Sequence, residues 1–504
     1  MKKSYSVFMY GMAAVLVFLL TTPVFAGGKQ ARDSGGALDT SRRVELTMYV
    51  LGAEPPKQHE LFENFNKMAL EKLNCTLKTQ YISYSEFWTK YPLIFSSGEI
   101  FDMAYAGTWL NFNQLAQRGA FLELDDLWPK YAPKNYAMQS PTAIRQATVT
   151  DHLYTIPTLL ATYSAYGILY RTDLALPYGW NGRMETFADM ENYLEIVKKN
   201  NPSIEPLDIY SSGSYMDDIF LYNHGYYYST GSASNDFLFF DPAQSNPKLM
   251  TYYEWDKTPE FLSMMARWNQ AGYFSKSALS DTDSLKFRNG KTAAMIHNID
   301  NYESNYRLHP EWNIRYSNYV SDISNLAFTQ DALVISRTSR NPERAVALYE
   351  LITTDEEMFR AFFYGIQGKS YDIETVNGRQ YVKALNPQDY EFSSCWASRT
   401  RQFFMPEVGA PPDLQQHKDA YDSYIKDGVK SQKFRSFTID TTSVETEYAN
   451  CVNVHQQYWW PLELGYVDQV RGLAEYREKM QAAGIDRVRT VIQAQLDAYL
   501  AGLK

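Results

Sequence analysis

The segment SSGEIFDMAYAGTW, residues 96–109, ends in a tryptophan that directly follows a short apolar run typical of a buried strand. Gly107 and Thr108 permit the chain to turn before Trp109. Ligands of open α/β sheets bind beyond the carboxyl ends of the strands, where such a side chain would lie. We therefore expect Trp109 to contact a ligand, with burial beneath the next helix as the alternative, and we expect Asp102, inside the run, to be structural.

The residue types that usually carry catalysis do not form a recognisable motif. The seven histidines are scattered without a His-x-x-x-His spacing, and no Cys-x-x-Cys occurs, so the common zinc signatures are absent. The stretch GIQGKS (365–370) lacks the first glycine of a phosphate-binding loop, and Gly-x-Ser-x-Gly does not occur. A glycoside hydrolase needs only two carboxylates about 5–10 Å apart, so this enzyme class stays open.

Length and charge restrict the fold and the class of partner. The chain has 504 residues, more than the roughly 250–300 at which one hydrophobic core stops growing, so at least two lobes are expected. With 48 basic and 58 acidic residues its net charge is −10, which disfavours a nucleic acid because a phosphate backbone requires concentrated positive charge. Three cysteines allow at most one disulfide.

The first 26 residues have the pattern of an export signal. Lys2 and Lys3 precede an apolar segment of about 14 residues, and Val24-Phe25-Ala26 forms a small-x-small cleavage site. A membrane anchor is the alternative, but a transmembrane helix needs about 20 apolar residues. A lipoprotein would need a cysteine directly after the site, but the first cysteine is Cys75. We therefore expect a soluble periplasmic or secreted protein that begins with a flexible leader at 27–43.

Beyond the leader, apolar patterns alternate between strand and helix periods. Strands are expected at 44–52, 75–83 and 100–107, with a helix from Pro55 or Pro56 to Leu73 and another at 86–95. This alternation predicts a mostly parallel sheet with helices on its faces.

A second set of elements follows the extended segment LYTIPTLLA (153–161), which is expected to cross between lobes. A helix should open at Thr186, and a strand should end in the polar tip of FRNGKTAAMIHNID (287–300). Residues 331–365 predict a strand and two helices, the first capped by Asn341. The Tyr-, Ser- and Asn-rich stretch 201–258 suits recognition loops better than a core.

The tail from Asp468 to Leu503 predicts two amphipathic helices split at Gly484. We expect their apolar face to pack on its own lobe, with membrane or partner binding as the alternative. This face is formed by Ile485, Val488, Ile492, Leu496, Tyr499 and Leu503.

Several weak motifs occur in a consistent order over nearly the whole mature chain. They are FSSGEIFDMAYAGTWLNFNQLAQRGAFLELDDLWPKYAP, YTIPT, ILYRTDLALPYGW, FRNGKTAAMIHN, ISRTSRNPERAVALYELITTDE and FTIDTTSVETEYANCVNVHQQYWWPLELGYVDQV. Together they resemble the extracellular solute-binding proteins of ATP-driven sugar importers. The last segment is similar to the LplA-like branch, whose long members carry an extra C-terminal region.

This resemblance implies a two-lobed α/β periplasmic-binding-protein fold of type II-like topology, each lobe a mostly parallel sheet flanked by helices, with a helical C-terminal extension. The first lobe would contain 44–155 and 305–365, and the second 156–304 and 366–504. The lobes would close around a solute. The implied function is to capture a carbohydrate, an oligosaccharide in particular, and to deliver it to an inner-membrane ABC permease. The protein would act as a monomer, without catalysis, metal or cofactor.

The sequence departs from the family's pattern at two places where ligand contacts are plausible. GIQGKSY (365–371) stands where the family has Gly-Ile-Glu-Gly-Lys-His-Tyr, and Arg399-Thr400 replaces the usual Gly-Asn after Trp396. The specificity of relatives is therefore not carried over.

A sugar site combines aromatic platforms for the apolar ring faces with polar groups for the hydroxyls. Each expected ligand residue has a structural alternative, such as helix capping for Glu54 or lobe packing for Tyr163. One tyrosine of 226–228 should also reach the solute. The expected ligand-binding residues are Glu54, Trp109, Tyr163, Tyr166, His224, Asn298, Asp300, Gln367 and Trp396.

Two other functions stay open at this point: binding of a peptide or another polar solute, and a secreted glycoside hydrolase. The charge of the ligand is also open. Arg399 or Arg401 could pair with the carboxylate of an acidic sugar, whereas the net charge of −10 favours a neutral one.

Overall fold

The computed structural model describes residues 38–83, 87–163, 166–210, 215–229, 236–319, 327–393, 395–426, 433–434 and 437–503. Residues Met1–Asp39 and Thr40–Lys504 form two separate units, and the helices and strands described below belong to the second. The expected export signal and most of the leader lie outside the described residues. Within the described ranges, no helix is both long and apolar enough to cross a membrane.

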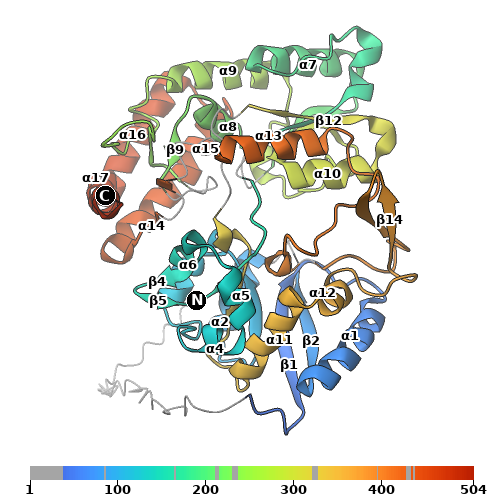
Figure 1. Ribbon diagram of the computed structural model, residues 1–504. Helices are drawn as coiled ribbons and strands as arrows, with labels where there is room; N and C mark the ends of the chain where they lie inside the picture. Colours follow the sequence, from blue (N-terminus) through green and yellow to red (C-terminus); the bar gives the residue numbers. More distant parts are fainter. Residues whose placement is uncertain are drawn as a thin grey trace, which may run out of the picture. The chain divides into compact units, whose positions relative to one another are not determined.

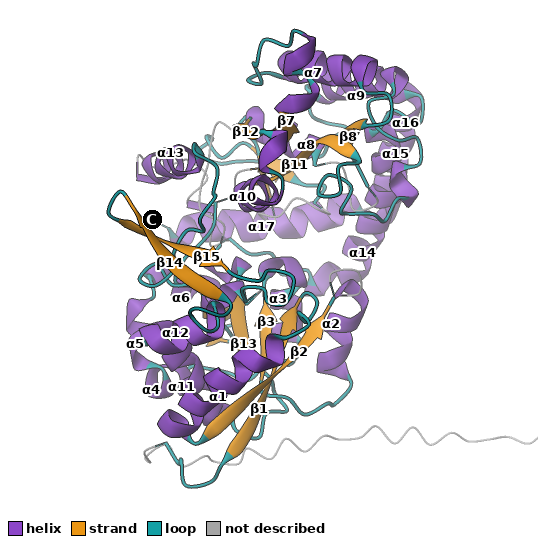
Figure 2. Cartoon of the chain, turned by 90° about the vertical axis from the view of Figure 1, so that its right-hand side faces the viewer, coloured by secondary structure: helices purple, strands orange, loops and turns teal. Residues whose placement is uncertain are grey.

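The first lobe is built on a five-stranded mixed sheet with the order β2-β1-β3-β13-β6. Figure 2 labels β1, β2, β3 and β13 of this sheet. β1 pairs in parallel with β2 and β3, and β13 pairs antiparallel with β3 and β6. Apolar side chains of β1 and β13 are buried on both faces, as expected for inner strands. The bounds are β1 Val44–Leu51, β2 Cys75–Ile82, β3 Met103–Ala106, β6 Ile156–Pro157 and β13 Ala332–Ile335.

Helices with one apolar face cover this sheet (Figure 1). α1 buries Leu61, Phe65 and Ala69 at helical spacing and packs against β2 and α12. α11 is buried over most of its length, between α1, α4 and α5. The first-lobe helices are α1 Gln58–Leu73, α2 Phe87–Ser96, α3 Phe112–Gln117, α4 Leu127–Tyr131, α5 Pro133–Met138, α6 Pro141–Ala147, α11 Pro342–Thr354 and α12 Glu356–Phe363.

The second lobe contains a four-stranded sheet with the order β12-β7-β11-β8. β8 and β11 are parallel, whereas β7 is antiparallel to both β11 and β12. A capping box between Thr186 and Asp189 begins α7 as the sequence predicts. The bounds are β7 Tyr166–Arg171, β8 Glu205–Asp208, β11 Thr292–Asn298, β12 Ile314–Asn318, α7 Phe187–Asn200, α8 Met216–Asn223, α9 Thr258–Ala271 and α10 Ile299–Leu308.

Three short antiparallel pairs accompany the two main sheets. The β14–β15 hairpin packs through Tyr371 and Val382 against Phe359 and Tyr364, next to the first lobe. The pairs are β4 Thr148–Val149 with β5 His152–Leu153, β9 Tyr227–Tyr228 with β10 Phe239–Phe240, and β14 Tyr371–Val376 with β15 Arg379–Ala384.

The C-terminal helices complete the core of the second lobe. The apolar face of the last helix packs on the second lobe, as expected, because four of its residues are buried in the same cluster as Trp268: Ile485, Val488, Ile492 and Leu496. Leu503 is exposed instead. Trp459 stacks on Tyr252 with ring centroids 4.0 Å apart. Its Nε1 donates to Asp217 at the start of α8 over 3.3 Å. The elements are α13 Leu414–Lys426, α14 Glu445–Val454, a π-helix His455–Trp459, α15 Trp460–Glu463, α16 Gln469–Ala483 and α17 Ile485–Gly502.

Gly465 marks the closest approach of this C-terminal region to α9. It has a φ of +67°, and a Cβ built there would lie 2.7 Å from the Cα of Ala266. Asn269 of α9 also donates from Nδ2 to the carbonyl of Gly465 over 2.8 Å.

We expect Gly465→Ala to destabilise the protein by more than about 1 kcal/mol, because it adds a backbone clash to the strain of a positive φ. Gly378→Ala is the matched control, since Gly378 has a φ of +79° with nothing within 4 Å of its Cβ position. Melting temperatures of both variants check this. Equal losses would contradict a close approach at Gly465.

The two-lobed α/β architecture with a helical C-terminal region is confirmed, but the sheets are mixed rather than mostly parallel. β13 pairs antiparallel with β3, and β7 pairs antiparallel with β11. The domain bounds stay a prediction as a whole. β12, at 314–318, lies in the second sheet rather than in the first lobe as expected, because it pairs with β7 over five residues.

The aromatic stretch 201–258 differs from the expected recognition loops in its described parts. Tyr227, Tyr228 and Phe239 are buried, and Tyr226 is half-buried with its ring 5.3 Å from that of Trp255. Tyr228 and Tyr252 share a hydrogen bond of 2.5 Å between their hydroxyls. These aromatic side chains therefore form core rather than an exposed surface.

The structure also tests the expected cap by Asn341 and the state of the three cysteines. Asn341 stands at the start of α11, but its side chain makes no capping hydrogen bond. The three cysteines, Cys75, Cys395 and Cys451, are buried free thiols.

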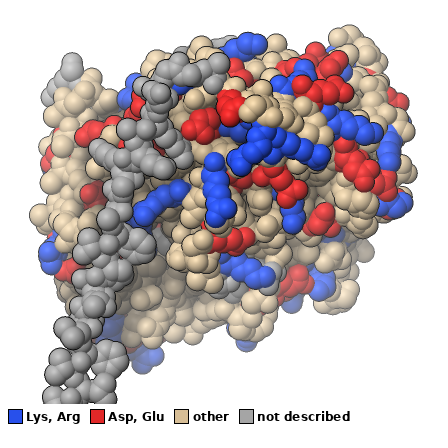
Figure 3. Space-filling view, turned by 90° about the horizontal axis from the view of Figure 1, so that it is seen from below, with Lys and Arg blue, Asp and Glu red and all other residues tan. Residues whose placement is uncertain are grey.

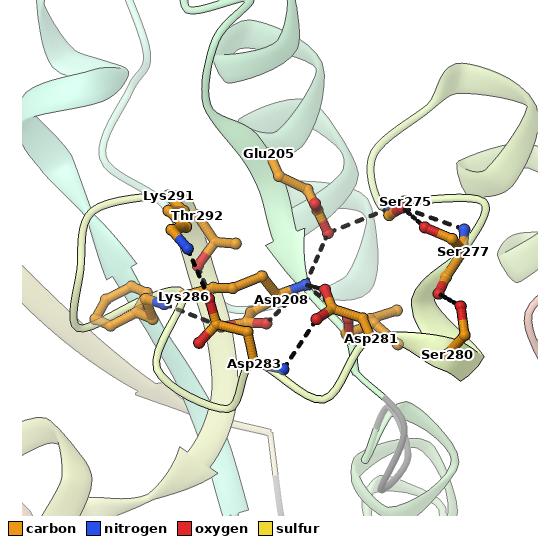
Figure 4. A network of polar contacts seen from close by, with 12 residues as sticks. Glu205, Asp208, Ser275, Ser277, Ser280, Asp281, Asp283, Lys286, Lys291 and Thr292 are labelled. Atoms are coloured by element: carbon orange, nitrogen blue, oxygen red, sulfur yellow. Dashed lines mark hydrogen bonds and ion pairs between the residues drawn. The ribbon is translucent and has the colours of Figure 1, made fainter.

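A buried lysine joins β8 to the loops that follow α9 (Figure 4). The Nζ of Lys286 lies 2.9 Å from Asp281, 3.3 Å from Asp208 and 3.4 Å from Glu205, and it donates to the carbonyl of Ile209 over 2.8 Å. Its side chain is only 6% exposed. Burial lowers the pKa of Lys286, but the three carboxylates raise it more, so the ammonium stays charged.

Candidate functional site

Trp109 lies in the short 3₁₀ turn Thr108–Leu110 directly after β3, as the sequence predicts. Its Nε1 donates to the carbonyl of Gln330 over 3.0 Å, and its ring meets Phe87 edge-on at 5.4 Å. Gly107 is required here because a Cβ would lie 2.5 Å from the Gln330 carbonyl oxygen and 2.7 Å from the Trp109 ring. The turn therefore fixes a partly exposed indole at the carboxyl end of the strand.

A second partly exposed tryptophan, Trp396, also contacts the buried ring of Tyr105. The ring centroid of Tyr105 is 6.0 Å from that of Trp396 and 6.2 Å from that of Trp109. Two of the predicted residues, far apart in the sequence, are thus brought to one place by a tyrosine of β3 that sequence reasoning missed.

A charged cluster contacts Tyr105 and Trp396. Arg399 donates from Nη2 to Asp331 over 2.6 Å and from Nε to the carbonyl of Trp396 over 3.2 Å. Tyr105 donates its hydroxyl to the other oxygen of Asp331 over 2.5 Å. The Nη1 of Arg399 lies 3.6 Å from Asp300, which belongs to α10 of the second lobe. The 3₁₀ turn Trp396–Ser398, which directly precedes Arg399, contacts β13 and α11 of the first lobe rather than lying in the second lobe as expected. The Asp300–Arg399 pair therefore joins the two lobes.

The charge states in this cluster follow from burial and proximity. Burial lowers the pKa of Arg399, but Asp331 and Asp300 raise it more, so the guanidinium is charged. Burial and the neighbouring Asp331 raise the pKa of Tyr105 well above its usual value, so its hydroxyl remains a donor. Asp331 is therefore held by two donors at once.

The second lobe contributes the polar tip of β11. Asn298 caps α10, with its side-chain oxygen accepting from the backbone N–H of Asn301 over 3.1 Å. His297 accepts on Nδ1 from the N–H of Asn298 over 2.9 Å, and burial lowers its pKa, so it is neutral at pH 7. The carboxylate of Asp300 is 44% exposed. This strand end therefore presents an amide and a carboxylate within three residues.

Both predicted tyrosines of the crossing region lie near this tip. The backbone of Tyr166 pairs with Asn298 in the sheet. Tyr163 packs against the cluster that contains Met295 and Ile299. Their positions agree with a place close to Asn298, while their contact with a ligand stays a prediction.

The remaining predicted residues have partners elsewhere. Glu54 is exposed after β1, and its charge adds to the burial that raises the pKa of Tyr81 to about 12. Gln367 is exposed and donates to Asp372 over 3.1 Å. His224 ends α8, with Nδ1 2.8 Å from the carbonyl of Phe220, which is the contact of a structural residue. Their role in binding is a prediction that these contacts do not support.

One group of possible metal ligands occurs in the described ranges, away from the tryptophans. Glu123, Asp125 and His152 offer ligand atoms that lie within 4.8 Å of one another, but all three side chains are exposed. Exposed groups of this kind are common without an ion, so we assign no metal to them.

The charges on the face shown in Figure 3 are mixed. Lys and Arg side chains are interspersed there with Asp and Glu side chains. This pattern differs from the concentrated positive charge that a nucleic-acid backbone requires.

Comparison with known proteins gives two matches to family models. Residues 56–359, more than half of the chain, match the family described as "Bacterial extracellular solute-binding protein". Residues 433–501 match a second model, described as a domain of unknown function (DUF3502). This second segment contains most of the C-terminal helices that complete the second lobe.

Similar proteins extend over nearly the whole chain. A curated protein of Streptococcus pneumoniae, named carbohydrate ABC transporter substrate-binding protein, is 24% identical over 98% of this chain and 99% of its own. The crystal structure of the N-glycan transport solute-binding protein NgtS from Streptococcus pneumoniae matches with a TM-score of 0.75 at 22% identity, over 92% and 100% of the two chains.

An extracellular solute-binding protein from Bifidobacterium longum subsp. infantis matches with a TM-score of 0.63 at 15% identity, over 92% of this chain and 100% of its own. At such identities the solved structures establish the fold alone, and the LplA-like branch stays a prediction. The family itself rests on the model match, so the chain belongs to the bacterial extracellular solute-binding proteins.

Proposed function

We propose that this protein is the substrate-binding component of an ABC transporter, which captures an oligosaccharide and delivers it to an inner-membrane permease. The observation that carries the sugar assignment is the pair Trp109 and Trp396, both partly exposed around Tyr105 and next to the polar tip of β11. Aromatic faces beside carboxylates and amides match the apolar faces and hydroxyls of a sugar. The names of the similar proteins point to the same ligand class.

The two lobes would share the ligand. Trp109 and Trp396 would stack on it from the first lobe, and Asn298 and Asp300 would bind its hydroxyls from the second. A ligand that contacts both lobes stabilises the arrangement in which they lie together, and the permease can distinguish this state from the empty one. Binding needs no catalysis, and the similar proteins are named as binding proteins. A periplasmic or secreted location, cleavage after Ala26 and a monomeric state belong to this proposal.

A thermal-shift screen of the mature chain tests the proposal. A sugar at 100 times its dissociation constant should add about 2.7 kcal/mol of stability and raise the melting temperature. The panel should contain oligosaccharides and short peptides, and bound sugar should be recovered intact after long incubation. A shift by peptides alone, or release of reducing ends, would replace the proposal by one of its alternatives.

Trp109→Ala is expected to weaken sugar binding by about 2 kcal/mol, roughly thirtyfold, because a stacking surface at the centre of a site is lost. Trp109→Phe should retain part of the affinity. The control is Trp312→Ala, which removes a half-buried tryptophan that stacks on His309 in the second lobe at 3.5 Å. Calorimetric titration measures all three. An affinity unchanged by Trp109→Ala would remove Trp109 from the site.

A further inference from the structure

Arg399 is the cation of the charged cluster next to Trp396, and its charge is already balanced by neighbouring carboxylates. Arg399 is 8% exposed, its Nη2 and Nε are used by Asp331 and Trp396, and its Nη1 faces Asp300. One guanidinium thus stands against two carboxylates. The more exposed of these is Asp300, whose side chain is 44% exposed against 7% for Asp331.

The other charged groups along α10 are paired as well. Arg307 lies 2.5 Å from Glu407 and 3.7 Å from Glu303. Lys418 lies 3.2 Å from Glu303. Among Asp300, Arg399 and Asp331, the carboxylate of Asp300 is therefore the most accessible charge.

This arrangement determines how a charged sugar would be received. A uronate residue has a carboxylate at C6 where the neutral sugar has a hydroxymethyl group. Placed beside Asp300, this carboxylate would face a like charge before it could reach Arg399, whose Nε and Nη2 already donate and whose Nη1 faces Asp300. A neutral sugar instead offers hydroxyls that can donate to Asp300, which gives charge-assisted hydrogen bonds.

We infer that the ligand is a neutral oligosaccharide and that the triad Asp300–Arg399–Asp331 excludes acidic ones. This inference rests on the proposed function. It assigns Asp300 the role of a specificity residue: it binds hydroxyls and also compensates the charge of Arg399. Arg399 then serves as the cation of the triad and not as a receptor for a ligand carboxylate.

Matched sugar pairs test this directly. Mannotetraose against tetramannuronate, and galactotetraose against tetragalacturonate, differ only in the C6 group. For the pair whose backbone the protein accepts, the neutral member should bind at least about tenfold more tightly at low salt. A uronate that binds as tightly as its neutral partner, or more tightly, would overturn the inference and leave sugar binding intact. No response to any sugar of a broad panel would remove the proposed function and this inference together.

Asp300→Asn identifies the residue responsible. It should lower the neutral-to-uronate preference at least about tenfold, because it removes the repelling charge and leaves Nη1 of Arg399 without a carboxylate. Asp283→Asn is the matched control, since it removes the same charge from a pair with Lys291 elsewhere in the second lobe. Arg401→Met tests the exposed arginine two residues further along. A preference unchanged in Asp300→Asn but altered in Arg401→Met would overturn the role of the triad.

Discussion

Lys286→Met is expected to lower the free energy of unfolding by about 3–5 kcal/mol, which is the usual cost of removing one partner from a buried ion pair. Asp208, Glu205 and Asp281 would then lie together without the ammonium that now lies within 3.4 Å of each. Asp208 is itself buried and keeps only the backbone N–H of Phe287 and the hydroxyl of Thr292 as donors. Because methionine has a similar length, the loss reports charge rather than volume.

The matched control for this change is Lys291→Met. Lys291 also pairs with an aspartate of the same loop, Asp283, at 2.7 Å, but its side chain is 61% exposed. Exposed pairs of this kind contribute little to stability, because water and salt screen their charges. Chemical denaturation of both variants, followed by a probe of the second lobe, should separate them clearly. Equal losses would show that Lys286 acts as an ordinary surface lysine.

The pH dependence of the same variant gives a second readout. Burial raises the pKa of Asp208 to about 6 despite the attraction of Lys286. A carboxyl group with a raised pKa stabilises the fold when protonated, and this contribution is lost as the pH rises through about 6. Without Lys286 the pKa of Asp208 rises further. The deficit of Lys286→Met should therefore be smaller at pH 5 than at pH 8, and an equal deficit would point to packing instead.

The parts of the fold that sequence alone predicts are those set by local pattern. The strand at 44–51, the helix at 58–73 and the strand at 75–82 follow directly from apolar spacing and from the prolines at 55 and 56. The partners of later strands do not. β13 pairs with β3 across more than 200 residues, and β12 returns to β7, because register between distant strands is decided by packing that no local window contains.

The candidate site divides in the same way. Trp109 could be expected at a strand end because Gly107 and Thr108 mark a turn next to it. Asp102 is structural, as expected: it accepts from the N–H of Thr47 over 3.0 Å and from the hydroxyl of Ser339 over 2.6 Å. The link between Asp331 and Arg399 joins positions 68 residues apart. In the local sequence, only the position of Asp331 directly before β13 hints at this link.

The contacts of the C-terminal region extend beyond the packing that its sequence predicts. Its apolar face predicts packing, but Trp459 also donates to Asp217 at the start of α8, two residues from Tyr215. The ring of Tyr215 lies 6.2 Å from that of His297, beside the polar tip of β11. The segment that matches a domain of unknown function therefore contacts the start of α8, next to a residue that lies beside the polar tip of β11.

Arg399→Met is also expected to lower the free energy of unfolding by about 3–5 kcal/mol. It leaves the carboxylate of Asp331 buried without its cation, and among the described residues the hydroxyl of Tyr105 is then its remaining side-chain partner. The structure around β13 and the crossing segment should be affected first, since Thr158 donates to the carbonyl of Arg399 over 3.2 Å. Differential scanning calorimetry measures the loss.

A second substitution separates charge from packing at this site. In Arg399→Met, adding Asp331→Asn removes the unpaired charge while an amide oxygen can still accept from Tyr105, so most of the stability should return. If the double variant is no more stable than Arg399→Met, the guanidinium acts by filling space, and the cluster is not held by its charges.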